Sequence, residues 1–189
     1  MAKASGNTRT VRPTSGSIEH NRNVFGYETS MPDVIKAESY FSEKSGGYFL
    51  VMNGHNLDTI EREAFRHLAD NGFLVIATPE GGKTFISGIN DKGKATYSDG
   101  LAMGNVFELK SPSPQSNASD HLDNSIKKAL NHARSKNAKV PIIYDRNGIY
   151  HRDNIERGLS DYEKKSEVRF KAILVIDKNG KVWEHQHNK

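Results

Sequence analysis

Hydrophobic residues recur along this chain at two spacings, which predict helices in some segments and strands in others. Between residues 57 and 71, apolar side chains fall three and four positions apart, as they do on one face of a helix. This stripe consists of Leu57, Ile60, Ala64 and Leu68. Asn56 or Asp58 can cap the start of the helix, and Gly72 can end it, because glycine readily adopts the left-handed conformation found just past a helix.

Three further segments are predicted to be helical. The longest covers residues 121–135 and has the same helical spacing of apolar side chains. Its stripe consists of Leu122, Ile126, Ala129, Leu130 and Ala133. Another helix is predicted over about residues 152–165. A short helix is expected from Asp33 to about Phe41, before the first strand.

Short apolar runs rich in β-branched and aromatic residues predict the strands. They cover residues 48–52, 73–77, 83–89, 95–98, 105–110, 140–144, 169–176 and 181–187. Residues 90–93 and 177–180 have the composition of hairpin turns, whereas the longer helices connect strands by crossovers. Because both connections occur, we predict an α/β fold with a mixed sheet flanked by helices. From residue 57 the core reads helix, three strands, helix and strand, followed by an added helix and a C-terminal hairpin.

The length of 189 residues fits one domain with an extension. Residues 1–31 are rich in Ser, Thr, Gly, Asn and Arg and have almost no hydrophobic pattern, so we expect a flexible N-terminal tail. Such a tail would serve as a linker or as a docking arm. Residues 32–56 are predicted to form a short helix and strand extension, and residues 57–189 the main domain.

Composition narrows the classes of function. The net charge of +4 and the pI near 9.2 favour a polyanionic partner. The absence of cysteine excludes disulfides, a thiol nucleophile and a cysteine-ligated zinc site. No apolar run approaches the roughly 18 residues of a membrane span, and the start of the sequence has no apolar signal-peptide region. We therefore expect a cytoplasmic protein with no signal peptide and no membrane partner.

The strand at residues 105–110 carries the strongest candidate for chemistry. Side chains two apart on a strand share a face, so Glu108 and Lys110 point into one space while their apolar neighbours pack on the other side. Such a strand is expected to be central in the sheet, where charged side chains need a partner. The two residues could pair with each other, or they could hold a metal ion and a phosphate.

Two more carboxylates are candidates for the same site. Asp99 lies in a Ser-Asp-Gly turn, where Asp often serves local hydrogen bonding, but the turn could also deliver it beside Glu108. These two carboxylates would suffice for one hard cation. Glu61 falls within the apolar stripe of the first long helix, whereas Glu63 falls on its flank. A carboxylate in that stripe is costly to bury unpaired, so it either reaches solvent or an arginine, or reaches the metal, and we favour Glu61.

Basic and histidine residues offer further candidates. The outer face of the helix at 121–135 is polar and basic, and is either a solvated surface or a phosphate-binding one. Its members are Lys127, Lys128, Asn131 and Arg134. His185 and His187 share a strand face and could bind zinc, but we expect both to be exposed. His151 precedes the third long helix and is expected to be structural or to face substrate.

The order of these elements, with an Asp ending one strand and Glu-x-Lys on the next, resembles the PD-(D/E)XK phosphodiesterase superfamily, which has a restriction-endonuclease-like core. Residues 57–187 more closely resemble the C-terminal tRNA-nuclease toxin domains of contact-dependent inhibition proteins (the CdiA type). The matching segments are 68–72 (Leu-Ala-Asp-Asn-Gly), 98–100 (Ser-Asp-Gly), 105–112 (Asn-Val-Phe-Glu-Leu-Lys-Ser-Pro) and 126–130 (Ile-Lys-Lys-Ala-Leu). The chain has Ser98 where the superfamily motif has Pro.

This resemblance implies metal-dependent cleavage of RNA, tRNA in particular. It implies Asp99, Glu108 and Glu61 as ligands of Mg²⁺ or Mn²⁺, with Zn²⁺ as another option, and Lys110 at the nucleophile or the scissile phosphate. It also implies an immunity protein as a partner and, because similar domains occur in phage and mobile-element proteins, a phage or mobile-element particle.

Two other functions stay open. A metal-independent ribonuclease of the barnase, colicin or RelE type would use Lys110 with His151 or His185 for acid–base catalysis. A non-enzymatic component of a phage or mobile-element particle would keep the fold for binding and would use the N-terminal tail as its docking arm.

Overall fold

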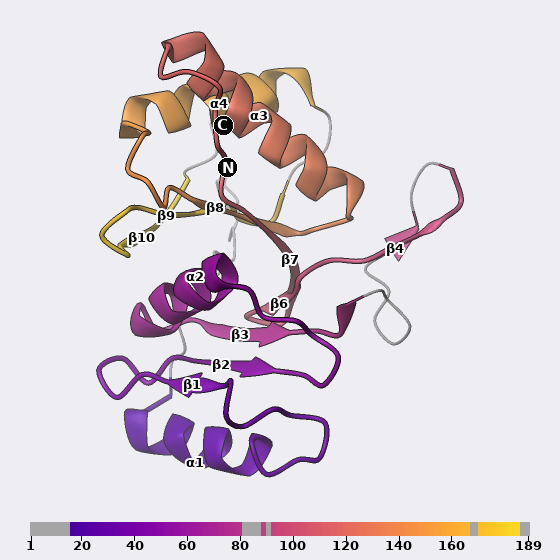
Figure 1. Cartoon of the computed structure of the whole chain (residues 1–189), viewed down its shortest axis with the longest axis vertical. Helices are drawn as coiled ribbons and strands as arrows, with labels where there is room; N and C mark the ends of the chain where they lie inside the picture. Colours follow the sequence, from indigo (N-terminus) through magenta and orange to yellow (C-terminus); the bar gives the residue numbers. More distant parts are fainter. Residues whose placement is uncertain (1–15, 81–87, 90–91, 167–169, 186–189) are drawn as a thin grey trace, which may run out of the picture.

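One mixed β-sheet forms the centre of the molecule (Figure 1). The computed structural model describes residues 16–80, 88–89, 92–166 and 170–185, and within these ranges the sheet has eight strands in the order β1-β2-β3-β6-β7-β8-β9-β10. They are β1 (Tyr40–Phe41), β2 (Tyr48–Val51), β3 (Leu74–Ala77), β6 (Gly100–Ala102), β7 (Asn105–Lys110), β8 (Val140–Tyr144), β9 (Leu174–Ile176) and β10 (Val182–Glu184). The pairs β2–β3, β7–β8 and β8–β9 are parallel and the other neighbours antiparallel, which confirms the mixed α/β sheet.

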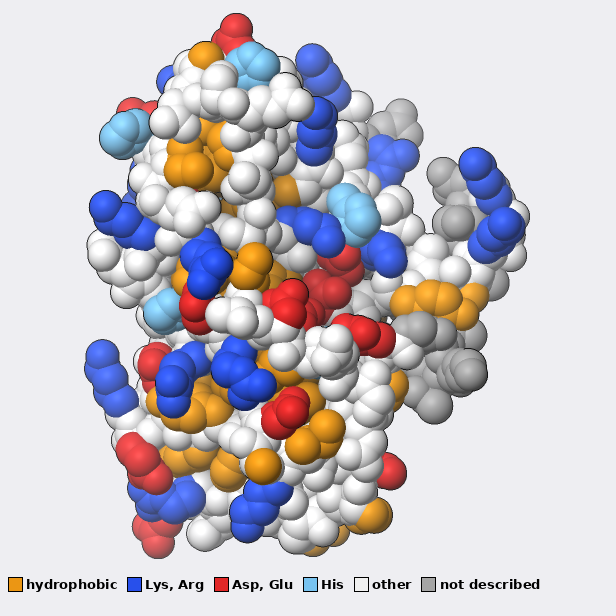
Figure 2. All heavy atoms as spheres, in the orientation of Figure 1, with side chains coloured by type: hydrophobic (Ala, Val, Ile, Leu, Met, Phe, Trp, Pro, Cys, Tyr) orange, Lys and Arg blue, Asp and Glu red, His pale blue; other side chains and the backbone are white. Residues whose placement is uncertain are grey.

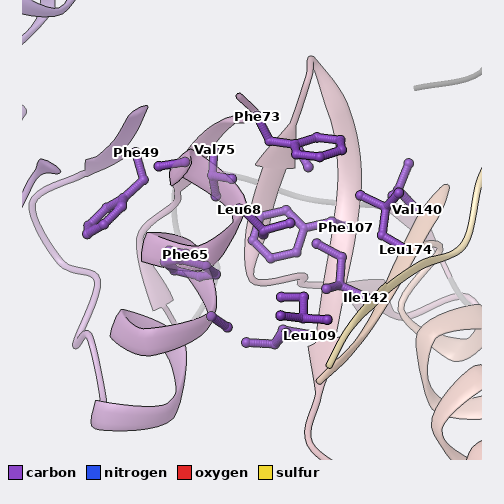
Figure 3. Close-up of a cluster of buried hydrophobic side chains, with 14 of the residues drawn as sticks. Phe49, Phe65, Leu68, Phe73, Val75, Phe107, Leu109, Val140, Ile142 and Leu174 are labelled. Atoms are coloured by element: carbon purple, nitrogen blue, oxygen red, sulfur yellow. The ribbon is translucent and has the colours of Figure 1, made fainter. Parts of the chain in front are cut away.

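Helices cover both faces of this sheet. The helices are α1 (Ile18–Glu28), α2 (Thr59–Asp70), α3 (Ser119–Ser135) and α4 (Arg152–Lys165). Successive side chains of β8 point to opposite faces, so Ile142 joins the core under α2 and Ile143 joins the core under α3 and α4. The core under α2 is drawn in Figure 3, where Phe65 meets Phe107 of β7 edge-on, with 5.6 Å between ring centroids. No helix in the described part of the chain is long and apolar enough to cross a membrane.

Local sequence accounts for α2 as predicted. Asp58 accepts a hydrogen bond from the N–H of Glu61, and the Glu61 side chain accepts one from the N–H of Asp58, so the helix begins with a capping box. Gly72 follows the helix with a φ of 86°, the left-handed conformation that glycine adopts without a Cβ penalty. From α2 onward the main sheet and its helices follow the order α2, β3, β6, β7, α3, β8, α4, β9, β10, and two short strands, β4 (Gly88–Ile89) and β5 (Ala95–Thr96), lie between β3 and β6 in the chain but outside that sheet. The added helix α4 and the C-terminal hairpin of β9 and β10 are as predicted.

The N-terminal part of the structure differs from the prediction. Residues 18–28, within the expected flexible tail, form α1, whose Phe25 packs on Phe41 and Tyr48 with ring centroids 5.6 and 5.5 Å apart. The aromatic contacts lie on β1 and β2, so the sequence pattern of α1 alone could not reveal them. The helix expected from residue 33 to 41 is wrong: the segment turns and ends in β1, because its backbone bonds to the end of β2.

The strands before β7 also differ. Of the strand expected at 83–89, residues 83–87 lie outside the described ones, and β4 (Gly88–Ile89) pairs with β5 (Ala95–Thr96) in a separate two-stranded sheet. The antiparallel neighbour of β7 is β6, which begins after Asp99, so the expectation that Asp99 ends a strand is wrong. A Cβ on Gly100 would lie 1.9 Å from the carbonyl oxygen of Ile76, so only glycine lets β6 approach β3 this closely.

Candidate functional site

Strand β7 delivers Glu108 and Lys110 to the face of the sheet that α3 covers. The Lys110 Nζ atom lies 3.1 Å from Glu108 Oε1, so the two side chains share one space, as their spacing along the strand predicts. His132 of α3 reaches the same oxygen, with its Nε2 atom 2.9 Å away. Glu108 is only 3% exposed, whereas Lys110 and His132 are open to solvent on one side. A buried carboxylate thus meets an ammonium and an imidazole at the surface.

The turn before β6 brings Asp99 to the same place. Its Oδ2 atom accepts a hydrogen bond of 2.6 Å from the backbone N–H of Leu109, the residue between Glu108 and Lys110. Since β6 and β7 are antiparallel neighbours, with Gly100 opposite Phe107, the residue before β6 must lie beside the second half of β7. The strand pairing therefore gathers Asp99, Glu108 and Lys110, three residues expected at one site.

Burial favours the protonated forms of the two carboxyl groups. Burial, and then the charge of Glu108, raise the pKa of Asp99 to about 7, although a backbone hydrogen bond and Lys110 lower it in part. Burial also raises the pKa of Glu108, against the opposing effect of Lys110. Burial, Lys110 and Lys136 lower the pKa of His132, so its imidazole is neutral near pH 7. Adjacent carboxyl groups with raised pKa values are typical of sites that bind a cation or move a proton.

Three buried oxygen atoms around these carboxyl groups have no hydrogen-bond partner in the described part of the chain. They are Glu108 Oε2, Ser98 Oγ and Thr78 Oγ1. Ser98 precedes Asp99 in the chain, and Thr78 donates its backbone N–H to the Asp99 carbonyl oxygen over 3.2 Å. Buried polar atoms in proteins nearly always have a partner, which can be a water or an ion. The Glu108 Oε2 atom in particular offers a carboxylate oxygen to a cation, since the other oxygen of this group is already bonded.

Glu61 lies in the first turn of α2 and has other direct partners. Its Oε2 atom accepts the backbone N–H of Asp58 over 3.1 Å and lies 3.4 Å from His55 Nε2. Its charge helps to raise the pKa of Asp99, so the two carboxylates interact electrostatically. Among the described residues, however, its hydrogen bonds and ion pairs do not reach Asp99 or Glu108.

The carboxylate of Glu61 belongs to a second group of ligand-type side chains. His55, Glu61 and Glu80 each place one ligand atom within 4.8 Å of the others. His55 and Glu80 were not predicted as ligands, because they lie in separate loops after β2 and β3 and share no motif. Glu63, the less favoured of the two α2 glutamates, pairs instead with Arg146, whose Nε atom lies 2.6 Å away.

A cavity of about 850 Å³ opens beside Lys110 and His132. The loop after β7 and the exposed side of α3 form its walls, and Lys127 and Lys128 lie among its lining residues. Arg134 lines a smaller cavity of about 90 Å³, shared with Lys127, between α3 and α4. In Figure 2, Asp and Glu side chains gather near the middle of one face, with Lys, Arg and His side chains around them. The larger cavity can therefore hold an anionic ligand next to Lys110.

The histidines named from the sequence lie elsewhere. His151 is exposed at the start of α4. The expectation that His185 is exposed is wrong: it is 2% exposed, with its Nδ1 atom 2.6 Å from Glu156 and its Nε2 atom 3.5 Å from Glu163. The residue is buried because β10 pairs with β9, which places the residue after β10 against α4. His187 lies outside the described residues.

His132 belongs to the site around Glu108 but was not predicted from the sequence. It lies four residues after Lys128 and directly before Ala133, at the border between the basic face and the apolar stripe of α3. A side chain at such a border can reach the neighbouring strand, but the chain has eight histidines, and local sequence does not show which of them does so. Only its contact with Glu108, 24 positions earlier, distinguishes it.

Comparisons with known proteins find a similar fold. No family model and no curated protein sequence matches this chain. Among solved structures, the fold is similar to that of a chain in the CdiA-CT/CdiI toxin and immunity complex from Burkholderia pseudomallei. The match covers 68% of this chain and 83% of the other, at 17% identity and a TM-score of 0.44. A likeness this distant assigns no role to any residue.

Proposed function

We propose that this chain is a metal-dependent endoribonuclease with Asp99, Glu108 and Lys110 at its active site. The observation that carries the proposal is the buried Glu108 Oε2 atom, which has no hydrogen-bond partner among the described residues and belongs to a carboxylate beside Asp99. This donor set fits a divalent cation, because carboxylate oxygens are the ligands that Mg²⁺ and Mn²⁺ prefer. A cation held there would lower the pKa of a bound water and polarise a phosphoryl oxygen.

The other side chains have separate roles in this proposal. Lys110 is 37% exposed, so its ammonium can turn from Glu108 toward a phosphate in the cavity. There it would stabilise the negative charge that develops on the phosphoryl oxygens during cleavage. His132, neutral near pH 7, would hold the Glu108 carboxylate in place through its 2.9 Å contact, as the partners of metal ligands commonly do.

The substrate we propose is RNA, with tRNA as the favoured class. Lys127 and Lys128 line the cavity next to Lys110, where they would contact phosphates on either side of the cleaved bond. The choice of tRNA, a toxin-like role and an immunity protein as partner rest on the sequence resemblance to CdiA-type nuclease domains. A protein with this activity would require such an inhibitor in the cell that makes it.

Cleavage of total RNA by the purified chain tests the proposal. Wild type should cleave RNA with Mg²⁺ or Mn²⁺ and lose the activity in EDTA. Glu108→Gln and Lys110→Ala should be inactive in the presence of either metal. Glu63→Gln is the matched control, because Glu63 is a partly exposed carboxylate paired with Arg146 and lies outside the proposed site. No cleavage by wild type with any divalent metal, or full cleavage by Glu108→Gln, would overturn the proposal.

A second function is favoured by one observation, the contact of His132 with Glu108. A carboxylate and an imidazole 2.9 Å apart beside a lysine can also act as base and acid in a metal-independent ribonuclease. His132, rather than His151 or His185, would then supply the acid–base chemistry. Cleavage that resists EDTA, leaves a 2′,3′-cyclic phosphate and disappears in His132→Gln would select this mechanism over the metal-dependent one.

A further inference from the structure

We propose that His55, Glu61 and Glu80 form a second binding site for a divalent cation, with Zn²⁺ as the best match. The three side chains come from the loop after β2, the first turn of α2 and the loop after β3, and their ligand atoms lie within 4.8 Å of one another. This site is distinct from the Asp99 and Glu108 carboxylates, and the inference does not depend on the proposed ribonuclease activity.

The hydrogen bond of His55 Nδ1 directs the other ring nitrogen, Nε2, toward the Glu61 carboxylate. Its Nδ1 atom lies 2.7 Å from the carbonyl oxygen of Thr78, which can only accept, so Nδ1 carries the proton. In the neutral ring Nε2 is then an acceptor, and it faces another acceptor, the Glu61 carboxylate, at 3.4 Å. Two acceptors face each other favourably only when a second proton on His55 Nε2 or a metal cation lies between them, and zinc binding distinguishes the two cases.

The same hydrogen bond is the one that metal-binding histidines usually make. A histidine that binds a metal through one nitrogen nearly always donates its other N–H to a carboxylate or a backbone carbonyl, which fixes the ring. The His55 side chain is only 1% exposed, so surrounding atoms also restrict its rotation. Glu61 is fixed as well, because its carboxylate accepts the N–H of Asp58 at the start of α2. Two of the three ligands are therefore already oriented.

The distance between these two ligands matches zinc. Zn–N and Zn–O bonds of about 2.0–2.1 Å at tetrahedral angles place neighbouring ligand atoms roughly 3.3 Å apart, and His55 Nε2 lies 3.4 Å from Glu61 Oε2. Glu80 is exposed, so its side chain can rotate to complete the set. One imidazole and two carboxylates with an open fourth position suit Zn²⁺ better than Mg²⁺, which prefers oxygen ligands alone.

The backbone of Thr78 connects the His55, Glu61 and Glu80 group to Asp99 of the proposed active site by two hydrogen bonds. Its carbonyl oxygen accepts the His55 N–H, and its own N–H donates to the carbonyl oxygen of Asp99. The charge of Glu61 is also one of the causes that raise the pKa of Asp99. A cation bound by Glu61 would therefore place positive charge close to the Asp99 carboxylate.

Zinc stoichiometry of the full chain tests this inference separately from the proposed function. After removal of metals with EDTA, Zn²⁺ binding is measured by calorimetry and by elemental analysis of dialysed protein. The double variant Asp99→Asn/Glu108→Gln removes the first site and should still bind one Zn²⁺. Adding His55→Gln should abolish that binding, and adding Glu80→Gln should weaken it at least about tenfold. His20→Gln, an exposed histidine on α1, is the control and should change nothing.

The results show separately whether the His55 site and the Asp99 and Glu108 site bind zinc. If the double variant binds no Zn²⁺, the His55 site is wrong, and a proton on His55 accounts for its contact with Glu61, since that carboxylate and the Thr78 carbonyl raise the pKa that burial lowers. If wild type binds one Zn²⁺ that only His55→Gln removes, the second site stands and the first fails to bind zinc. Because Glu80 is exposed, Glu80→Gln is expected to fold, so unchanged affinity in that variant would also overturn the proposal.

Discussion

Replacing Asp99 by Asn should stabilise the metal-free protein at alkaline pH, although it removes a proposed catalytic ligand. The pKa of Asp99 is raised from 3.8 to about 7, mainly by burial and by Glu108. Between these two pH values the folded protein holds a proton that the unfolded chain has released. The free energy of unfolding therefore falls as pH rises from about 4 to about 7, and Asn, which never ionises, avoids this loss.

The magnitude follows from the pKa difference. A shift of about three pH units at 1.36 kcal/mol each gives an upper limit of about 4 kcal/mol. Because Asp99 is only partly buried, water reduces the effect, and we expect a gain of about 1–2 kcal/mol for Asp99→Asn at pH 8. The variant keeps an oxygen that can accept the Leu109 N–H, so the turn before β6 retains its hydrogen bond.

Urea unfolding in EDTA at pH 5 and pH 8 measures this effect. The gain of Asp99→Asn over wild type should be larger at pH 8 than at pH 5. Glu63→Gln should instead change stability by nearly the same amount at pH 5 and pH 8. Hydrogen bonding to Arg146 lowers the pKa of Glu63 from 4.5, so its stabilising contribution is present at both pH values and is lost only in more acidic solution. If Asp99→Asn is no more stable than wild type at pH 8, or its gain is the same at both pH values, then Asp99 is a structural residue and the reasoning fails.

Two further predictions test the scaffold and the cavity. Gly100→Ala should destabilise the fold by about 3 kcal/mol or more in urea unfolding, because its Cβ would lie 1.9 Å from a β3 carbonyl oxygen. Gly104→Ala, with no atom within 4 Å of its Cβ but a φ of 75°, should cost only about 1 kcal/mol, and equal costs would contradict the close approach of β6 to β3. In the Glu108→Gln background, Lys128→Ala should reduce the slope of log Kd for single-stranded RNA against log salt by about 0.7. Lys164→Ala, on the exposed surface of α4, should leave the slope unchanged, and a similar reduction there would mean that the cavity is not the RNA-binding surface.

Short-range rules predicted the parts of the fold whose causes are local. The apolar stripe, the Asp58 cap and Gly72 all lie between residues 57 and 72 and determine α2, and the structure has this helix with a capping box. The alternation of β7 placed Glu108 and Lys110 on one face from their spacing alone. In contrast, α1 was missed because its apolar contacts lie on β1 and β2, more than ten residues away.

The sequence by itself determined the α/β class, the central strand and the shared face of Glu108 and Lys110, because each depends on neighbours within one element. Only the tertiary structure decided which side chains complete the sites. His132 contacts Glu108 because α3 packs over β7. His55, Glu61 and Glu80 lie together because the loops after β2 and β3 come close to the first turn of α2. Such contacts join residues far apart in the chain, and no periodic pattern encodes which of many polar side chains will meet there.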